Sequence, residues 1–463
     1  MMEFHLEENS SKKIHFMGIG GCSMSGIAEL MFDHGYQVSG SDRERGKYTK
    51  HLEKIGIPIA YQQTADNIKD QDLFIYTDAI PESSEELQTA RKTGKPCLSR
   101  GQFLGTIMKN YDRSISVSGS HGKSTTTSMI TEILMDSKQD ATILLGGSFD
   151  GIEGNVHTGS GDLFLAEGCE FKGNIRYYFP RLAIVLNIDE DHLDYYRNLD
   201  DIVHAFSDYM ENLSESSIAV LNFDDPNCKK IASSVKGKVV SYGMGSDQVD
   251  YYAHSITFDE KGHPSFDVTL PNGQNESFHL QIIGRYNVYN ATAAIAAMDQ
   301  MGVGMKEIQK GIAAYQSLHR RMELIGQFRQ ADILTDYGHH PKEIQATLDA
   351  LAEHKKNRLI CVFQPFTYSR TRTLMDQFAT AFASADEVIV TKILGGREVD
   401  DGSVHSEELV DRLKKNGVKA HYCETFDDCQ ALLSEILQPE DLVMTTGCGN
   451  IDQLAHQLVQ ADK

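Results

Sequence analysis

The residues with the clearest chemical meaning lie in the segment SVSGSHGKSTTTSMI, residues 116–130. A glycine-rich loop that leads through Lys-Ser into a helix is typical of a phosphate site, where backbone N–H groups and one ammonium group hold a triphosphate. The usual spacing is G-x-x-x-x-G-K-S/T, and this segment is two residues shorter. It predicts a nucleotide site, with a Gly/Ser turn that carries an exposed lysine as the alternative. The residues predicted to hold the nucleotide are Gly119, Ser120, His121, Gly122, Lys123, Ser124 and Thr125.

A second glycine cluster lies near the N-terminus, in IHFMGIGGCSMSGIAELMFDHGYQVSGSD. Gly18, Gly20 and Gly21 follow a strand-like run, and Asp42 closes the next strand, 22 residues after Gly20. This spacing is similar to the dinucleotide-binding pattern, in which glycines admit a diphosphate and the acid contacts a ribose hydroxyl. A glycine turn that only packs helix on strand is the alternative. Because two nucleotide sites in consecutive units are unusual for a dehydrogenase, we expect one of them to hold a substrate.

Acidic residues and a histidine follow two further strand-like runs. FLAEGCEF places two acids at the end of one strand, and LNIDEDHLDYY places acids and a histidine at the end of another. Since ligands gather at the carboxyl ends of parallel strands, these side chains are expected to converge on the phosphate loop. Mg²⁺ needs few protein ligands beside water and phosphate oxygens, so Ser124, Glu167 and His192 are the predicted metal ligands. The alternative is that they are ordinary charged loop residues. The full set is Glu167, Glu170, Asp189, Asp191, His192 and Asp194.

The elements that must position these residues alternate between strand-like and helical patterns, which predicts an α/β fold with largely parallel sheets. A Rossmann-like domain is expected at residues 1–110, a central domain of the P-loop ATPase type at 111–316, and a Rossmann-like C-terminal domain at 317–463. Between Val239 and Gly284, period-two alternation with turns at DEKGHP and PNGQ predicts an antiparallel insert or a sheet edge.

Charge and composition exclude several classes of protein. The 463 residues include 66 acidic and 44 basic side chains, a net charge of −22, which repels nucleic acid and anionic membranes. No run approaches eighteen apolar residues, and the N-terminal segment lacks the apolar stretch of a signal peptide, so a cytoplasmic protein without membrane insertion is expected. The eight cysteines form no C-x-x-C pair and are expected to be reduced.

The order of the motifs resembles that of the Mur ligase family over nearly the whole chain. In that family the phosphate loop has the shortened spacing seen here. The resemblance implies three domains, which hold a UDP-sugar, ATP and, in the C-terminal domain that closes over both, an amino acid. The motifs that carry it are HFMGIGGCSMSGIAEL, SVSGSHGKSTTTSMI, LNIDEDHLDYY, IIGRYNVYNATAA, HRRMELIG, DYGHHPKEI, FQPFTYSRTRTL and TTGCGNI.

The reaction that the resemblance implies is ATP-dependent amide formation in peptidoglycan precursor synthesis, with Mg²⁺ as the metal. The lactyl carboxylate of UDP-N-acetylmuramate becomes an acyl phosphate, and L-alanine then displaces phosphate. A paralogous ligase for another amino acid or a recycled peptide is one alternative, and a non-catalytic UDP-sugar-binding regulator is another. A nicotinamide-dependent oxidoreductase has only the first glycine cluster in its favour. The chain is expected to act as a monomer or a homodimer.

The resemblance also assigns roles to single residues. The catalytic residues that it implies are Lys123, His192, His339 and Arg370. Those expected to contact ATP, beside the phosphate loop, are Asn287, Asn290, Arg320 and Asp336. Those expected to bind the UDP-sugar or the amino acid are Gly18, Gly20, Gly21, Ser25, Asp42, Glu170, His340 and Arg372. For the two arginines of SRTRT, solvated side chains at a helix start are the alternative.

The chain departs from the family pattern mostly at positions predicted to meet substrate. TDAI replaces SSAI, so that Asp78 stands where a diphosphate would approach and repels it unless its side chain points away. Asn174 and Ile175 stand in place of a Ser-Phe pair. The identity of the added amino acid is therefore left open. The remaining departures are Tyr286, Phe366, Cys448 and Asn450.

Overall fold

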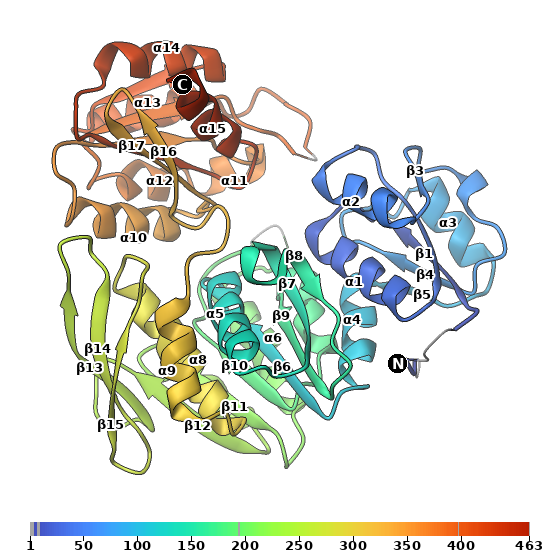
Figure 1. Ribbon diagram of the computed structural model, residues 1–463. Helices are drawn as coiled ribbons and strands as arrows, with labels where there is room; N and C mark the ends of the chain where they lie inside the picture. Colours follow the sequence, from blue (N-terminus) through green and yellow to red (C-terminus); the bar gives the residue numbers. More distant parts are fainter. Residues whose placement is uncertain (1–3, 7–9, 193–194, 397, 463) are drawn as a thin grey trace. The chain divides into compact units, whose positions relative to one another are not determined.

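The computed structural model describes residues 4–6, 10–192, 195–396 and 398–462. They form three β-sheets flanked by helices (Figure 1), which confirms the predicted α/β fold. Two compact units contain them: Met1–His254 with Val268–Glu276 and Tyr289–Ile312, and Ser255–Asp267 with Ser277–Val288 and Ala313–Lys463. The domain boundaries at residues 110 and 316 stay a prediction. In the described ranges, no helix is both long and apolar enough to cross a bilayer.

The first sheet has the strand order β3-β2-β1-β4-β5, with every pair parallel. Its central strand β1 is buried from its second residue onward, as expected of a strand covered on both faces. The strands are β1 Lys13–Met17, β2 Gln37–Ser41, β3 Ile59–Ala60, β4 Leu73–Tyr76 and β5 Cys97–Ser99. The helices are α1 Cys22–Asp33, α2 Lys47–Ile55, the 3₁₀ turn η1 Ala65–Asn67, α3 Glu85–Lys92 and α4 Arg100–Met108.

The second sheet has ten strands in the order β15-β14-β13-β12-β11-β10-β6-β9-β7-β8. Strands β7 and β8 pair in antiparallel fashion, whereas the pairs from β7 through β9, β6, β10, β11 and β12 are parallel. The strands are β6 Arg113–Ser118, β7 Ala141–Phe149, β8 Gly154–His157, β9 Leu163–Gly168, β10 Leu182–Val185, β11 Ile218–Asn222, β12 Lys238–Gly243, β13 Tyr251–Phe258, β14 Pro264–Thr269 and β15 Asn275–His279. The helices are α5 Lys123–Asp136, η2 Asp150–Ile152, η3 Phe171–Tyr177, α6 Leu199–Glu211, α7 Pro226–Ile231, η4 Ala232–Ser234, α8 Tyr286–Gln300 and α9 Met305–Ala314.

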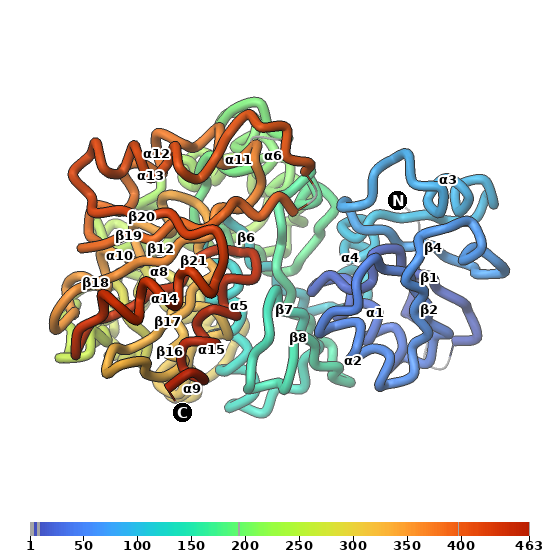
Figure 2. Tube along the Cα trace, turned by 90° about the horizontal axis from the view of Figure 1, so that it is seen from above, coloured from blue at the N-terminus to red at the C-terminus, as the bar shows by residue number. Residues whose placement is uncertain are grey.

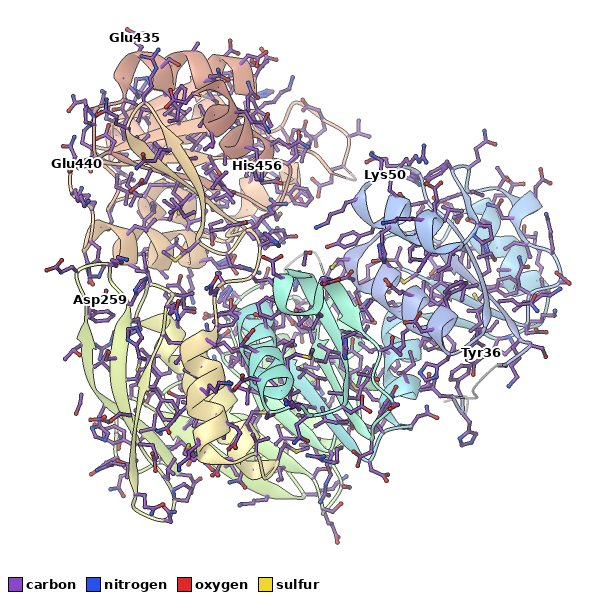
Figure 3. The ribbon with its side chains drawn as sticks, viewed as in Figure 1. Tyr36, Lys50, Asp259, Glu435, Glu440 and His456 are labelled. Carbon is purple, nitrogen blue, oxygen red and sulfur yellow. The ribbon has the colours of Figure 1, made fainter. Side chains whose placement is uncertain are left out.

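The predicted antiparallel stretch from Val239 is wrong at its beginning, because β12 pairs in parallel with both β11 and the first residues of β13. The prediction of a sheet edge is confirmed, since β13, β14 and β15 end the sheet. Asp259 lies at the turn between β13 and β14 (Figure 3), where its Oδ1 accepts hydrogen bonds from the N–H groups of Lys261 at 2.9 Å and His263 at 2.8 Å. That carboxylate fixes the turn.

The third sheet has the order β16-β17-β21-β18-β19-β20, parallel except for the β16–β17 pair. Two buried apolar clusters cover its two faces. The strands are β16 Glu323–Phe328, β17 Ala331–Asp336, β18 Leu359–Phe363, β19 Glu387–Thr391, β20 Ala420–Cys423 and β21 Leu442–Thr446. The helices are α10 Pro341–Ala352, α11 Tyr368–Thr373, α12 Met375–Ala381, α13 Ser406–Lys415, α14 Phe426–Ile436 and α15 Asp452–Ala461.

The first two sheets share one apolar core within the first unit. Helix α4 contributes Phe103 and Ile107, which belong to the same buried cluster as Ile175 and Phe206 beside the second sheet. Helix α1 packs against β7 and β8, as Figure 2 shows. The start of α1, which follows the first glycine cluster, is therefore held against the sheet that carries the phosphate loop.

Candidate active site

The phosphate loop joins β6 to α5 and takes backbone conformations that glycine adopts readily. Gly119 has φ +138° and Gly122 has φ +83°. Gly122 is the N-cap of α5, so no side chain caps the first turn of that helix. A Cβ atom on Gly122 would lie 2.5 Å from Oδ1 of Asn290 on α8. The structure thus places Asn290 beside the loop, and the helix start can present N–H groups to an anion.

Asn187, which follows β10, holds the shape of this loop. Its Oδ1 accepts a hydrogen bond from the N–H of His121 at 2.8 Å, and its Nδ2 donates to the His121 carbonyl at 3.1 Å. The Asn187 carbonyl accepts from the N–H of Ser120 at 3.1 Å. The hydroxyl of Ser120 accepts from the Asp189 N–H at 2.9 Å. Asn187 was not predicted from the sequence, because its only signal is its place at the end of a strand.

Lys123 makes a buried ion pair at the start of α5. Its Nζ lies 3.1 Å from both carboxylate oxygens of Glu170, whose side chain is 1% exposed. Burial by itself raises the pKa of Glu170, but the charge of Lys123 and the contact with His192 outweigh it and lower that pKa below its usual value. Burial disfavours the ammonium form of Lys123, yet Glu170 raises its pKa well above the usual value. Both groups are therefore charged at neutral pH.

The predicted metal ligands fall into two neighbouring groups. Ser124 Oγ donates to Oε2 of Glu167 at 3.0 Å. His192 instead lies with Glu170 and Asp191, and one ligand atom from each lies within 4.8 Å of the others. Carboxylate oxygens and an imidazole nitrogen gathered this closely fit a divalent cation. Asp194 lies outside the described residues.

The first glycine cluster is fixed from the neighbouring strand β2. Gly18 has φ +76°, and the N–H groups of Gly18 and Ile19 donate to the Ser41 carbonyl at 2.8 and 3.0 Å. The Gly20 N–H donates to Oδ2 of Asp42 at 2.7 Å. That oxygen of Asp42 therefore holds the loop itself, whereas the sequence pattern predicted a contact with a ribose hydroxyl.

The start of α1 is fixed by two further side chains. Gly21 is the N-cap of α1, with φ −69°, and contributes no side chain. Ser25 is buried, and its hydroxyl donates to the Cys22 carbonyl at 2.8 Å. Asn155 on β8 donates to the same carbonyl at 2.8 Å. The first sheet and the second are joined at this point.

In the second unit, Arg320 and Asp336 organise the loops at the carboxyl ends of β17 and β21. Arg320 Nη2 donates to the carbonyls of Gly447 at 2.8 Å and Gly449 at 2.9 Å, and its guanidinium lies 5.0 Å from the ring centre of Tyr337. Asp336 accepts from the N–H groups of Met322 at 2.9 Å and of Gly338 at 2.7 Å. Burial raises the pKa of Asp336. Four hydrogen bonds with backbone groups thus hold Arg320 and Asp336, the two side chains predicted to contact ATP.

The histidines predicted for this unit lie at the start of α10, and the arginines lie in the last turn of the short helix α11. His340 is the N-cap of α10, and the His339 N–H donates to Oε2 of Glu343 at 3.1 Å. Arg370, on α11, is close enough to Cys448 for its charge to act on that thiol, although burial dominates and raises the pKa of Cys448 to about 11. Arg372 instead contacts the hydroxyl of Ser403. The two arginines of SRTRT therefore point to different neighbours.

The departures from the family pattern in this unit have neighbours of their own. Tyr286 Oη donates to Sδ of Met322 at 2.8 Å. The next residue, Asn287, is a predicted ATP contact rather than a departure, and its Nδ2 donates to the Ile283 carbonyl at 2.8 Å. Phe366 forms a bridge with Leu394. The amide of Asn450 pairs with Gln364, whose Nε2 lies 2.9 Å from Oδ1 of Asn450. Each departure thus has a definite packing partner.

Comparison with known proteins covers all three sheets. The model of the Mur ligase family catalytic domain matches residues 13–112, that of the Mur ligase middle domain matches 117–298, and that of the Mur ligase glutamate ligase domain matches 320–449. The UDP-N-acetylmuramate–L-alanine ligase of Clostridium acetobutylicum is 39% identical over 458 residues, which cover 99% of this chain and 100% of that protein. The same-named ligase of Acetivibrio thermocellus is 40% identical, covering 98% and 97%.

Solved structures agree over nearly the same length. The UDP-N-acetylmuramate-alanine ligase of Thermotoga maritima superimposes with a TM-score of 0.82 at 27% identity, covering 97% of this chain and 98% of that one. A murein peptide ligase from Psychrobacter arcticus gives a TM-score of 0.76 at 23% identity, again covering 97% and 98%. The second likeness shows a shared fold.

Proposed function

The chain belongs to the Mur ligase family, and from this membership we propose that it joins L-alanine to the lactyl carboxylate of UDP-N-acetylmuramate at the expense of ATP, in peptidoglycan precursor synthesis. The observation that carries the proposal is the position of Lys123: it begins a helix whose N-cap is a glycine and pairs with a buried carboxylate. A cation in that position binds the phosphates of a nucleotide. Full-length relatives at 39% and 40% identity that carry this activity in their names support the choice of reaction.

The chemistry has two steps that need alignment and charge neutralisation more than a strong base. A carboxylate oxygen of the lactyl group attacks the γ-phosphorus of ATP, the bond to the β-phosphate oxygen breaks, and ADP leaves with an acyl phosphate formed. The nitrogen of L-alanine then attacks the acyl carbon, and phosphate leaves as the amide forms. Lys123 and the N–H groups at the start of α5 are proposed to bind the β- and γ-phosphates. Arg370 and His339 are proposed to act on the amide-forming step.

Mg²⁺ is the metal we propose for the site. When bound, it neutralises phosphate charge that develops during transfer. Ser124, Glu167 and His192 remain the proposed ligands, and Glu170 and Asp191 add two carboxylates next to His192. Lys123 already neutralises Glu170. The two remaining carboxylates, Glu167 and Asp191, then balance the charge of one divalent cation.

The sugar nucleotide is proposed to bind at the first glycine cluster, through Gly18, Gly20, Gly21 and Ser25, with Asp42 holding the loop. The C-terminal residues Arg320, Asp336, His340 and Arg372, together with Asn287 and Asn290, are proposed to contact ATP or L-alanine. We propose a cytoplasmic enzyme that acts as a monomer or homodimer and binds neither nucleic acid nor membrane.

Product identification tests the proposal. The purified protein is incubated with ATP, Mg²⁺, UDP-N-acetylmuramate and a mixture of amino acids, and the sugar nucleotide is analysed by mass spectrometry. The expected product carries one alanyl residue, with one phosphate released for each amide. A product with another amino acid or a peptide would favour a paralogous ligase. Binding of the sugar nucleotide without any product would favour a non-catalytic regulator.

A further inference from the structure

Two of the departures from the family pattern contact each other. The Nδ2 of Asn174 donates a hydrogen bond to Oδ2 of Asp78 at 2.7 Å, although the two residues are 96 positions apart. Lys172 Nζ donates to the Asp78 carbonyl at 2.6 Å. We call these contacts of Asp78 with Lys172 and Asn174 the bridge. Because its carboxylate is turned toward an amide donor, Asp78 is kept from facing a diphosphate directly.

On one side the bridge rests on the first glycine cluster. Asp78 follows Thr77, and the Thr77 N–H donates a hydrogen bond to the carbonyl of Met17 at 3.1 Å. Met17 is the residue directly before Gly18. A Cβ atom on Gly18 would lie 2.4 Å from Cγ2 of Thr77. The turn that carries Asp78 therefore packs tightly against the loop proposed to bind the sugar nucleotide.

On the other side the bridge rests on η3, which begins directly after Glu170. Lys172 has φ +51° and Gly173 has φ +70°, two consecutive residues in the left-handed region. A non-glycine residue adopts that conformation at a cost, so other contacts must hold it there. The hydrogen bond that Asn174 donates to the Phe171 carbonyl at 2.8 Å supplies one such contact.

The side chain of Asn174 has no room to move. It is 1% exposed, and a Cβ atom on Gly101 at the start of α4 would lie 2.0 Å from its Oδ1. Its Nδ2 already serves two acceptors, Asp78 and the Phe171 carbonyl. Both hydrogens of that amide are therefore used, and the contact with Asp78 is fixed in direction.

Together these contacts form a continuous path between the two glycine loops. Gly18 packs on Thr77, Asp78 bonds to Asn174, and η3 leads back to Glu170, which holds Lys123. We propose that Asp78 and Asn174 are a pair of positioning residues that set the place of the sugar-nucleotide loop relative to the phosphate loop, and so the approach of the acceptor carboxylate to ATP. The inference rests on the proposed function and deepens it.

A charge exchange across the bridge tests this. Asn174→Asp sets two carboxylates at hydrogen-bond distance, so kcat/KM for UDP-N-acetylmuramate is expected to fall at least about tenfold. The exchanged pair Asp78→Asn with Asn174→Asp restores one donor and one acceptor across the bridge but not the hydrogen bond to the Phe171 carbonyl, so it is expected to recover only in part, to a kcat/KM at least about threefold above that of Asn174→Asp. The Kd of a non-hydrolysable ATP analogue is expected to change by less than about twofold in every variant. A general loss of structure would instead weaken ATP binding as well.

A matched control makes the same change elsewhere. Gln457 on α15 donates through Nε2 to Oδ1 of the exposed Asp427 on α14 at 2.8 Å, so Gln457→Glu also sets a carboxylate opposite a carboxylate. This variant is expected to keep the wild-type kcat/KM for UDP-N-acetylmuramate. Wild-type kinetics in Asn174→Asp, or an exchanged pair that melts normally yet stays as impaired as Asn174→Asp, would overturn the inference.

If Asn174→Asp does not fold, Asp78→Ala and Asn174→Ala replace it. Their combined effect is then expected to equal the larger single effect, and additive losses would overturn the inference. Failure of the wild type to form the alanyl product would instead count against the proposed function. An active wild type whose exchanged pair does not recover counts against the bridge alone.

Discussion

Lys123 and Glu170 face each other at the start of α5, with Nζ 3.1 Å from both carboxylate oxygens and only 1% of the Glu170 side chain exposed. The contact joins the phosphate loop to the end of β9 and to the cluster of Asp191 and His192. A buried carboxylate holds the ammonium group where phosphates are proposed to bind, so nucleotide binding must share or replace this pair.

Lys123→Ala is expected to lower kcat by at least about a hundredfold, because one charged donor to the transferring phosphoryl group is lost. It is also expected to destabilise the fold by about 3 kcal/mol, since it removes the ammonium partner of the buried Glu170 and leaves that carboxylate only its longer contact with His192. Phosphate release and thermal unfolding measure the two effects. Adding Glu170→Gln should restore stability without restoring activity, and recovery of turnover in that double variant would contradict the role given to Lys123.

Removal of divalent cations with EDTA is expected to stop phosphate release, and added Mg²⁺ to restore it. Glu167→Gln and His192→Ala are each expected to raise the Mg²⁺ concentration for half-maximal activity by at least about tenfold. The exposed neighbour Glu190 supplies the control, since Glu190→Gln should keep the wild-type requirement. An unchanged Mg²⁺ titration in both site variants would argue against these ligands.

Two glycines of the first cluster are expected to respond differently to alanine. Gly18→Ala should destabilise the fold by about 1–3 kcal/mol, because φ is +76° and the new Cβ would lie 2.4 Å from Thr77. Gly21→Ala should melt like the wild type, since its nearest neighbours lie 3.9 Å away. It should nevertheless weaken calorimetric binding of UDP-N-acetylmuramate, because the methyl group occupies space proposed for the diphosphate. Unaltered affinity in Gly21→Ala would contradict that placement.

The thiol of Cys22 is expected to resist alkylation near neutral pH. Burial raises its pKa from the usual 9.0 to about 11, so little reactive thiolate is present. Labelling by iodoacetamide, located by peptide mass spectrometry, should accelerate about tenfold per pH unit up to that pKa. Because the folded pKa is the higher one, the stability this thiol contributes is complete below pH 9.0 and is lost as pH rises toward 11. Rapid labelling of Cys22 at pH 7.5, with the fold intact, would be inconsistent with the raised pKa.

Sequence predicted the parts of the site that depend on local pattern. The short strand before Gly119 and the apolar stripe after Ser124 were enough to place the loop at the start of α5, because both periods lie within one segment. Asn187 was missed because its contacts with the loop arise only when β10 pairs with β6. A single asparagine at the end of a strand belongs to no sequence motif that would indicate its partner.

Other differences have the same origin in tertiary pairing. Strand β12 lies within the stretch predicted to be antiparallel, yet it pairs in parallel with β11, and its last four residues are all buried. Strand β16 was not predicted, since it is an edge strand with a single buried residue and an irregularity between Leu324 and Gly326. The spacing of Asp42 after Gly20 correctly placed Asp42 beside the glycine loop. Its Oδ2, however, accepts a hydrogen bond from a backbone N–H of that loop.

The central claim is that the phosphate loop activates a carboxylate of the sugar by direct phosphoryl transfer. UDP-N-acetylmuramate labelled with ¹⁸O in its lactyl carboxylate tests it most directly. After incubation with ATP, Mg²⁺ and L-alanine, the released phosphate is expected to carry one ¹⁸O atom for each amide formed, because the attacking oxygen leaves with phosphorus. Amide formation with unlabelled phosphate would contradict the account.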